Sequence, residues 1–153
     1  MIFIENCKES HLDVVTEASC FYATELCPKK SLERSTINII FEDKLVDKEG
    51  YVGTCMKNGQ YHYDIMIEPT MNLQSILQTI AHEFVHVNQY MRRHLQNTYE
   101  SYSIWKGKKY SSNEYYFLPW EVEANGISVG LYEKFVDNFK YRDKDWYFDP
   151  LFI

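Results

Sequence analysis

The sequence predicts one small α+β domain in which a three-stranded sheet packs on helices. Three observations support this prediction. Apolar residues recur at helical spacing in three long segments, β-branched residues cluster in one short run, and an Asn-Gly pair separates two further strand-like runs. The chain has 153 residues, of which 45% are hydrophobic and 25% charged. These values fit a single globular domain over residues 1–153, without linkers or internal repeats.

The N-terminal third contains the first predicted helix and the first predicted strand. The helix covers residues 11–27, where apolar side chains fall on one face, and Pro28 ends it. The run Ser-Thr-Ile-Asn-Ile-Ile-Phe at 35–41 predicts a strand, because β-branched side chains pack well on a pleated sheet. The charged residues at 47–50 indicate a turn.

A β-hairpin is predicted next. Its strands cover 51–56 and 61–68, and the Asn58-Gly59 pair between them favours a tight turn. The odd-numbered positions of the second strand are Tyr, Tyr, Ile and Ile, and they share one face of the strand.

Two further helices flank an aromatic insertion. The helix predicted at 72–95 has an apolar stripe along one face, and the helix predicted at 120–140 begins after a proline. The insertion at 98–118 is rich in Tyr, Ser and Lys and is expected to contain a small hairpin at 101–110. The aromatic, irregular tail at 141–153 is expected to pack on the body of the domain.

Net charge argues against two classes of partner, and cysteine content indicates the cellular compartment. With a formal net charge of −6, the chain is expected to bind neither nucleic acid nor an anionic membrane surface. No secretory signal and no apolar run of membrane-spanning length is present. The lysines at 106, 108 and 109 are expected to form a solvated hairpin tip. We expect a cytoplasmic protein with reduced thiols at Cys7, Cys20, Cys27 and Cys55.

The most specific signal is the His-Glu-Phe-Val-His segment at 82–86. Because it lies in a predicted helix, His82 and His86 are one turn apart on the same face. Two imidazoles with this spacing can bind one Zn²⁺ at about 2.0–2.1 Å each. Glu83 projects beside the metal, where it can take a proton from a metal-bound water. A coincidental pair of histidines on a surface helix is the alternative, and the apolar neighbours of the motif weaken it.

A catalytic zinc site needs a third protein ligand and one open position. Glu121 is the best candidate because it opens the next predicted helix, 35 residues after His86. Cys55 stays conceivable, whereas His94 lies too far along its helix. The two remaining histidines, His11 and His62, precede the motif.

Several side chains are expected to support the ligands. Asn125 lies one turn after Glu121 and can hydrogen-bond to a ligating imidazole. Glu123 is expected to point away, where it would interact with the helix dipole. Gln89 lies near the metal face and can support a ligand in the same way. Tyr90 and Arg93 lie close to that face, and the tyrosines considered for stabilising an oxyanion are Tyr115, Tyr116 and Tyr132.

The motif at 82–86 followed by Glu-Val-Glu-Ala-Asn at 121–125 resembles the gluzincin arrangement, in the short form of the minigluzincins and the ImmA-type metallopeptidases. The longer strings His-Glu-Phe-Val-His-Val-Asn-Gln-Tyr and Pro-Trp-Glu-Val-Glu-Ala are similar to small HExxH proteins of bacteriophages. The resemblance covers about residues 60–135 and implies a zincin-like domain, a Zn²⁺ cofactor and hydrolysis of a protein or peptide substrate. Carried over by position, it implies that His82, His86 and Glu121 are ligands and that Glu83 is the general base.

Three functions follow from these observations. The favoured one is a zinc metallopeptidase of endopeptidase type, located in the host cytoplasm if a phage encodes it. The alternative is a zinc-containing phage or viral accessory protein that binds a host protein without cleaving it. Glu83 favours the first, because a purely structural zinc site needs no base. A DNA-linked protease of the SprT-like kind would need a basic or zinc-ribbon extension, which the sequence lacks.

The strand at 61–68 leads directly into the motif helix, so we expect it to form the rim of the cleft. At the sheet edge, its free N–H and C=O groups could pair with an extended peptide. The Tyr-rich insertion would form the opposite wall, and aromatic walls favour cleavage beside a hydrophobic residue. The alternative is that this strand is central and the insertion only a cap.

Overall fold

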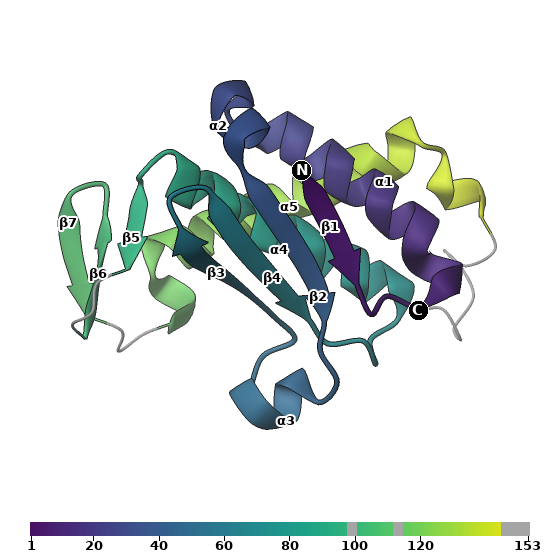
Figure 1. Ribbon diagram of the computed structural model, residues 1–153, viewed down its shortest axis with the longest axis horizontal. Helices are drawn as coiled ribbons and strands as arrows, with labels where there is room; N and C mark the ends of the chain where they lie inside the picture. Colours follow the sequence, from purple (N-terminus) through teal and green to yellow (C-terminus); the bar gives the residue numbers. More distant parts are fainter. Residues whose placement is uncertain (98–100, 112–114, 145–153) are drawn as a thin grey trace.

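A mixed sheet and a layer of helices make up the α+β fold of the computed structural model, which describes residues 1–97, 101–111 and 115–144 (Figure 1). The sheet has the order β1-β2-β4-β3 in the described residues. Its first three strands in that order run parallel, and β3 is antiparallel to β4. The strand bounds are β1 (Ile2–Glu5), β2 (Thr36–Phe41), β3 (Gly53–Gly59) and β4 (His62–Ile67).

The predicted hairpin is confirmed as β3–β4, but the sheet has one strand more than the sequence predicts. The additional strand is β1, which pairs in register with β2 from Ile2↔Ile37 onward. A strand of four residues is too short for its alternation to stand out in the sequence.

The expectation that the strand at 61–68 forms the sheet edge is wrong. Within β4, Ile65 pairs with Ile39 of β2 on one side and with Cys55 of β3 on the other. Its alternate residues Tyr63 and Ile65 are at most 1% exposed, as expected for an inner strand. The edge beside the motif helix is therefore β3.

Five α-helices are present in the described residues, and the three long ones are those that the sequence predicts. They are α1 (Glu9–Leu26), α2 (Lys29–Arg34), α3 (Leu45–Glu49), α4 (Leu73–Met91) and α5 (Pro119–Asn138). The residues predicted as a charged turn at 47–50 instead lie in and just after α3. In the described part of the chain, no helix combines the length and the apolar character needed to cross a bilayer.

The termini of α4 follow from their local sequence. At the start, Asn72 caps the helix by accepting a hydrogen bond from Ser75 N–H at 2.7 Å. At the end, Arg93 adopts a left-handed conformation with φ 58°. Arg93 N–H then bonds to Tyr90 C=O and His94 N–H to Gln89 C=O, which is the Schellman motif. This motif ends the helix at Met91, earlier than the predicted 95.

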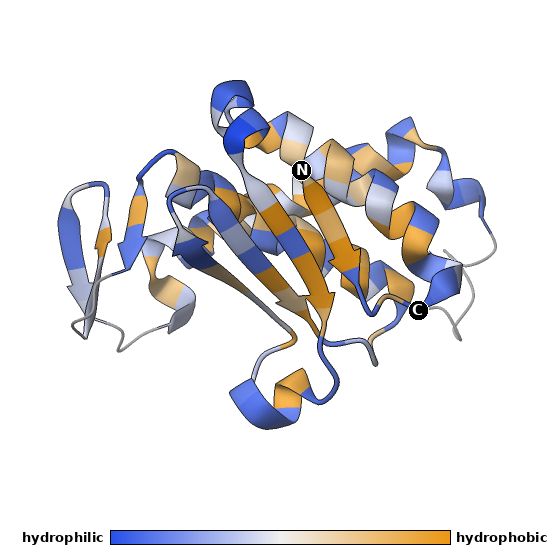
Figure 2. Cartoon of the chain, in the orientation of Figure 1, coloured by the Kyte–Doolittle hydropathy of each residue, from blue (hydrophilic) through white to orange (hydrophobic). Residues whose placement is uncertain are grey.

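The core lies between the sheet and α4. Both α1 and α5 pack against α4. Figure 2 shows the apolar residues as orange bands that alternate with polar ones along β2 and β4. The β-branched residues of these strands meet the apolar stripe of α4, and α5 adds Phe135, whose ring lies 5.6 Å from that of Tyr22 on α1. Among the fully buried residues are Ile37, Ile39, Ile65, Leu77, Ile80 and Phe84.

A second sheet with the order β5-β6-β7 lies beside the start of α5. Its strands are β5 (Leu95–Asn97), β6 (Tyr102–Trp105) and β7 (Lys108–Ser111), and the last two confirm the predicted hairpin. The rings of Trp105 and Tyr110 lie 6.3 Å and 5.9 Å from the ring of Trp120. These contacts anchor the first turn of α5. Short 3₁₀ helices η1 (Tyr115–Phe117) and η2 (Tyr141–Asp143) flank α5, and the predicted packing of the tail beyond 144 lies outside the described residues.

Candidate metal centre

Three side chains from two helices converge on one point. His82 and His86 project from the same face of α4, and Glu121 comes from the first turn of α5. The two Nε2 atoms are 3.1 Å apart. Glu121 Oε2 lies 3.3 Å from His82 Nε2, and Glu121 Oε1 lies 3.4 Å from His86 Nε2. In the described residues, this is the one group of His, Cys, Asp and Glu side chains that could hold a metal ion.

The distances between these ligand atoms fit a common ion. Ligands at about 2.0–2.1 Å from a tetrahedral centre are about 3.3 Å from one another, and the observed separations are 3.1–3.4 Å. Glu121 and His86 are 4% and 7% exposed, so the centre is largely shielded from solvent. The arrangement can therefore hold a metal ion without a rearrangement of the two helices.

Gln89 fixes which nitrogen of His86 faces the centre. The Gln89 amide donates two hydrogen bonds, to Trp120 C=O at 3.0 Å and to Glu123 Oε2 at 2.9 Å. Its Oε1 must then accept a hydrogen bond from His86 Nδ1, which lies 2.8 Å away. A proton on Nδ1 leaves the lone pair of Nε2 directed at Glu121 and His82, as a metal ligand requires.

Neither Glu123 nor Asn125 lies as the sequence predicts. The expectation that Glu123 points away from the centre is wrong, because it accepts the Gln89 hydrogen bond between α4 and α5. Asn125 is exposed, and no hydrogen bond joins it to an imidazole among the described residues. It instead lines a cavity beside His82. The prediction for Glu123 used only the direction of its Cα–Cβ bond on the helix. It did not consider the length of the side chain, which reaches around α5 to Gln89.

The electrostatics of the centre favour an ionised Glu121. Burial acts to raise the pKa of this carboxyl, but the hydrogen bonds and charges of His82 and His86 outweigh it and lower the pKa to about 2. Burial likewise opposes a charge on His86, yet Glu121 and Glu83 raise the pKa of the imidazole. An ionised Glu121 carboxylate beside two imidazole Nε2 atoms favours a cation at the point where the three side chains converge.

Glu83 lies beside the ligands but is not one of them. It is 4% exposed, and its burial raises the pKa of the carboxyl against the opposing effect of the two histidines. The backbone of β3 passes so close to it that a Cβ on Gly53 would lie 2.9 Å from Glu83 Oε1 and 2.4 Å from Thr79 Cγ2. The absence of a side chain at Gly53 therefore allows the edge strand to approach the Glu83 carboxylate.

The other candidate ligands are not part of this cluster. Cys55 lines the cavity beside it, His62 bonds to Asn38, and the ring of His94 packs near Trp105. His11 is buried on α1. The structure thus brings Glu121, the residue that the sequence favours as third ligand, together with His82 and His86.

Of the three candidate tyrosines, one reaches the centre. Tyr115 lines the cavities that contain Glu83, and burial together with the Glu121 and Glu83 carboxylates raises the pKa of its phenol. Tyr116 is 77% exposed, whereas Tyr132 is buried in the core.

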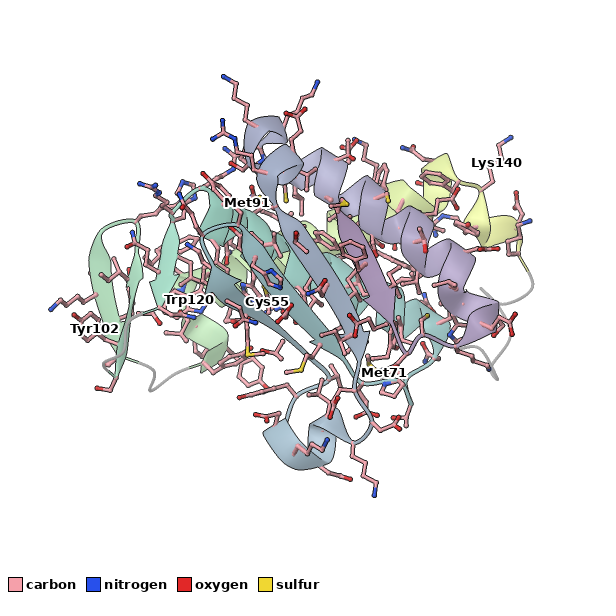
Figure 3. The ribbon with its side chains drawn as sticks, viewed as in Figure 1. Cys55, Met71, Met91, Tyr102, Trp120 and Lys140 are labelled. Carbon is pink, nitrogen blue, oxygen red and sulfur yellow. The ribbon has the colours of Figure 1, made fainter. Side chains whose placement is uncertain are left out.

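Three adjoining cavities form a groove along β3. A cavity of about 190 Å³ contains Glu83, His86 and Glu121, and Cys55 and Trp120, both labelled in Figure 3, line it from β3 and α5. It shares Gly53 and Glu83 with a cavity of about 480 Å³ on the His82 side. At its opposite end it shares the residues Tyr90, Leu95 and Asn97 with a third cavity of about 750 Å³.

Sequence reasoning missed Gly53 and Trp120 as parts of the site. Gly53 matters through its lack of a side chain, and its proximity to α4 depends on a strand pairing that the sequence does not show. Trp120 supplies a backbone carbonyl to Gln89, a contact to which its side-chain type gives no clue. The Pro119 that precedes it did mark the start of the helix correctly.

The sequence matches no protein-family model, and comparisons with curated proteins and with solved structures give no significant match.

Proposed function

We propose that this protein is a zinc-dependent metallopeptidase of the gluzincin type. The observation that carries the proposal is the convergence of His82, His86 and Glu121 at 3.1–3.4 Å beside the buried carboxylate of Glu83, at the wall of an open groove. A structural metal site closes its coordination with four protein ligands, whereas a catalytic site has three and an open position.

The chemistry of the ligands favours zinc. Two imidazole nitrogens and one carboxylate oxygen are a common ligand set of catalytic Zn²⁺, whereas Mg²⁺ and Ca²⁺ prefer oxygen ligands. A zinc ion bound here would supply a Lewis acid that polarises a peptide carbonyl and makes a water molecule more acidic.

The protein side chains would then manage protons and charge. Glu83 accepts a proton from the attacking water and delivers it to the leaving amine. Its shielded position and raised pKa suit a group that must both take up and release a proton. Tyr115 lines the cavity beside Glu83, and its phenol, whose pKa is raised further above neutral pH by burial and by the neighbouring carboxylates, can donate a hydrogen bond to the oxyanion.

The substrate would extend the sheet along β3 rather than along β4. Val52 C=O accepts the hydrogen bond of Glu68 N–H, so the alternation of an antiparallel pair turns the N–H and C=O groups of Gly53 and Cys55 toward the open edge. Both residues line the groove at the level of Glu83. An extended peptide paired with them would present its backbone to the three ligands.

The experiment compares zinc-loaded wild type with Glu83→Gln on an unfolded protein such as reduced casein. The amide has the shape of the carboxylate but cannot accept the proton, so turnover should fall at least about a hundredfold. Zinc content and thermal unfolding should stay unchanged. A matched control is Glu123→Gln, which keeps a hydrogen-bond acceptor for Gln89 and should retain activity.

Two results would contradict the proposal. Wild-type turnover in Glu83→Gln would exclude Glu83 as the base. Full zinc occupancy without cleavage of any unfolded substrate would favour the alternative of a zinc protein that binds its partner without cutting it.

A further inference from the structure

The groove along β3 has two ends of different charge. On the His82 side, Glu83 is the one Asp, Glu, Lys or Arg that lines it in the described part of the chain, beside uncharged residues such as Ser75 and Gln78. At the opposite end, Lys57 and Arg93 line the cavity of about 750 Å³, together with neutral residues. The protein as a whole carries a net charge of −6, so this pair of cations is a local exception.

The pleat of β3 places Lys57 on the groove side of the strand. Lys57 pairs with Tyr63, and Gly53 pairs with Ile67, both of which face the helices. Alternation therefore directs Gly53, Cys55 and Lys57 to the same face. Lys57 lies two residues beyond Cys55, about 6.6 Å farther along the strand, and so within reach of the same bound peptide.

Neither cation is neutralised by the described residues. No ion pair joins Lys57 or Arg93 to a carboxylate in that part of the chain. Asp64, the acidic residue of the neighbouring strand, faces away from the helices and accepts hydrogen bonds from Asn38 and Asn58. Both cations are exposed and available to a ligand.

Arg93 stands at the end of α4, where the chain turns toward the second sheet. It occupies the left-handed position of the Schellman motif that ends α4, where glycine is the usual residue because a side chain is strained there. Lys140 and three other non-glycine residues share this conformation, so it is the cavity lining that places the Arg93 side chain at the end of the groove.

We propose that Lys57 and Arg93 form a subsite for carboxylate side chains, so that the groove selects extended peptides with acidic residues on one side of the scissile bond. This inference rests on the proposed function, because a scissile bond exists only if the protein cleaves peptides. The binding preference itself can be measured without cleavage. Arg93 can receive a carboxylate through two parallel N–H groups, and Lys57 adds a second charge.

The test measures peptide binding to the zinc-loaded Glu83→Gln protein by fluorescence anisotropy. The probes are acetylated and amidated peptides with a central Leu, flanked on one side by three Glu, three Gln or three Lys. The Glu peptide should bind most tightly when its charges lie on one particular side. Lys57→Gln and Arg93→Gly should each weaken binding of the Glu peptide about threefold without affecting binding of the Gln peptide. Salt at about 0.5 M should reduce the difference in affinity between the Glu and Gln peptides.

Arg93→Gly separates an effect on binding from an effect on folding, because glycine relieves the backbone strain at this position. Its melting temperature should be equal to or higher than that of wild type, so weaker binding cannot be a result of unfolding. Lys140→Gly is the matched control. It also removes a cation from a left-handed position, with φ 55°, but Lys140 lies at the opposite end of the molecule from the second sheet, which carries Tyr102 (Figure 3). Its binding of the Glu peptide should be that of the parent.

Several outcomes would overturn the inference. Equal affinity for the Glu and Lys peptides would do so, as would a preference that persists in both Lys57→Gln and Arg93→Gly, or no peptide binding at all. A preference seen only with a free C-terminal carboxylate would overturn the assignment to side chains. If the zinc-loaded wild type binds the Glu peptide with this preference but does not cleave it, the proposed hydrolysis fails and the subsite stands.

Discussion

Gln89 and Gly53 act at the scale of single residues, one through its hydrogen bonds and the other through the space that it leaves. Gln89 is fully buried and makes three hydrogen bonds that link His86, α4 and α5. Gly53 lets the edge strand approach Glu83. Neither residue belongs to the cluster of His82, His86 and Glu121, yet both affect the geometry around it.

Replacing Gln89 tests the orientation of His86. Gln89→Met keeps the approximate volume but removes the acceptor for His86 Nδ1, so the imidazole loses its fixed tautomer. We expect zinc affinity, measured by competition with a chelating dye, to fall about 10- to 100-fold. Gln74→Met, on the same helix but outside this network, should leave the affinity unchanged. An unchanged affinity in Gln89→Met would contradict the role assigned to Gln89.

Adding a single methyl group at Gly53 tests the close approach of β3 to α4. Gly53→Ala should lower the free energy of unfolding by about 1–3 kcal/mol, because its Cβ would collide with Thr79 Cγ2. Thr79→Ser removes that methyl group and keeps the hydroxyl, so the double variant should regain most of the stability in urea unfolding. If Gly53→Ala is as stable as wild type, the strand lies farther from the helix than described.

At the scale of elements, the long helices and the strands beside clear turn signals could be predicted, whereas β1, α2 and α3 could not. The periodicity of α1, α4 and α5 extends over 18 to 20 residues, enough to distinguish a helix from other structure. β1, α2 and α3 have four to six residues, too few for a periodic signal. Their formation depends on tertiary partners, as when β1 pairs with β2.

The position of a strand within a sheet is likewise a tertiary property. The sequence predicted β4 as a strand and identified its buried face, but it could not show that β2 would pair with its free side. Because β4 directly precedes α4 in the chain, the sequence suggested that β4 is the edge strand beside this helix. In the structure β2 pairs with β4, and the edge strand is β3.

The Glu68 carboxylate forms hydrogen bonds with α3 and with the segment that connects β4 to α4. It accepts Val46 N–H at 3.1 Å and Thr70 Oγ1–H at 2.9 Å. These bonds, the one from Val46 first, lower the pKa of Glu68 from its usual value of 4.5. Because the folded pKa is the lower one, the stabilisation is present above about pH 4.5 and is lost as the pH falls through the folded pKa.

Glu68→Gln should therefore lower the melting temperature at pH 7 and have a smaller effect at about pH 3, where the wild-type carboxyl also becomes protonated. Circular dichroism melts across this range measure the difference. Glu49→Gln, an exposed position of α3, serves as the control and should leave the melting temperature at pH 7 close to that of wild type. A constant gap between Glu68→Gln and wild type would show that the ionised form is not favoured by folding.

At the scale of the whole molecule, the candidate site depends on how α4 and α5 pack. The sequence predicted both histidines and Glu121 because helical spacing and ligand chemistry are local properties. The roles of Gln89 and Glu123 depend on the side-chain contacts between α4 and α5, and the groove depends on the position of β3. The second sheet adds to this arrangement, since Trp120 packs against two of its aromatic rings and holds the turn that carries Glu121.

The most direct test of the central claim is the zinc content of purified protein that has been stripped of metal, loaded with zinc and desalted. Elemental analysis should find about one zinc per chain in wild type. His82→Ala and Glu121→Ala should each lose it, whereas His62→Ala, a histidine outside the cluster, should keep it. Full zinc occupancy in Glu121→Ala, with the protein still folded, would contradict the assignment of the third ligand and with it the account of the site.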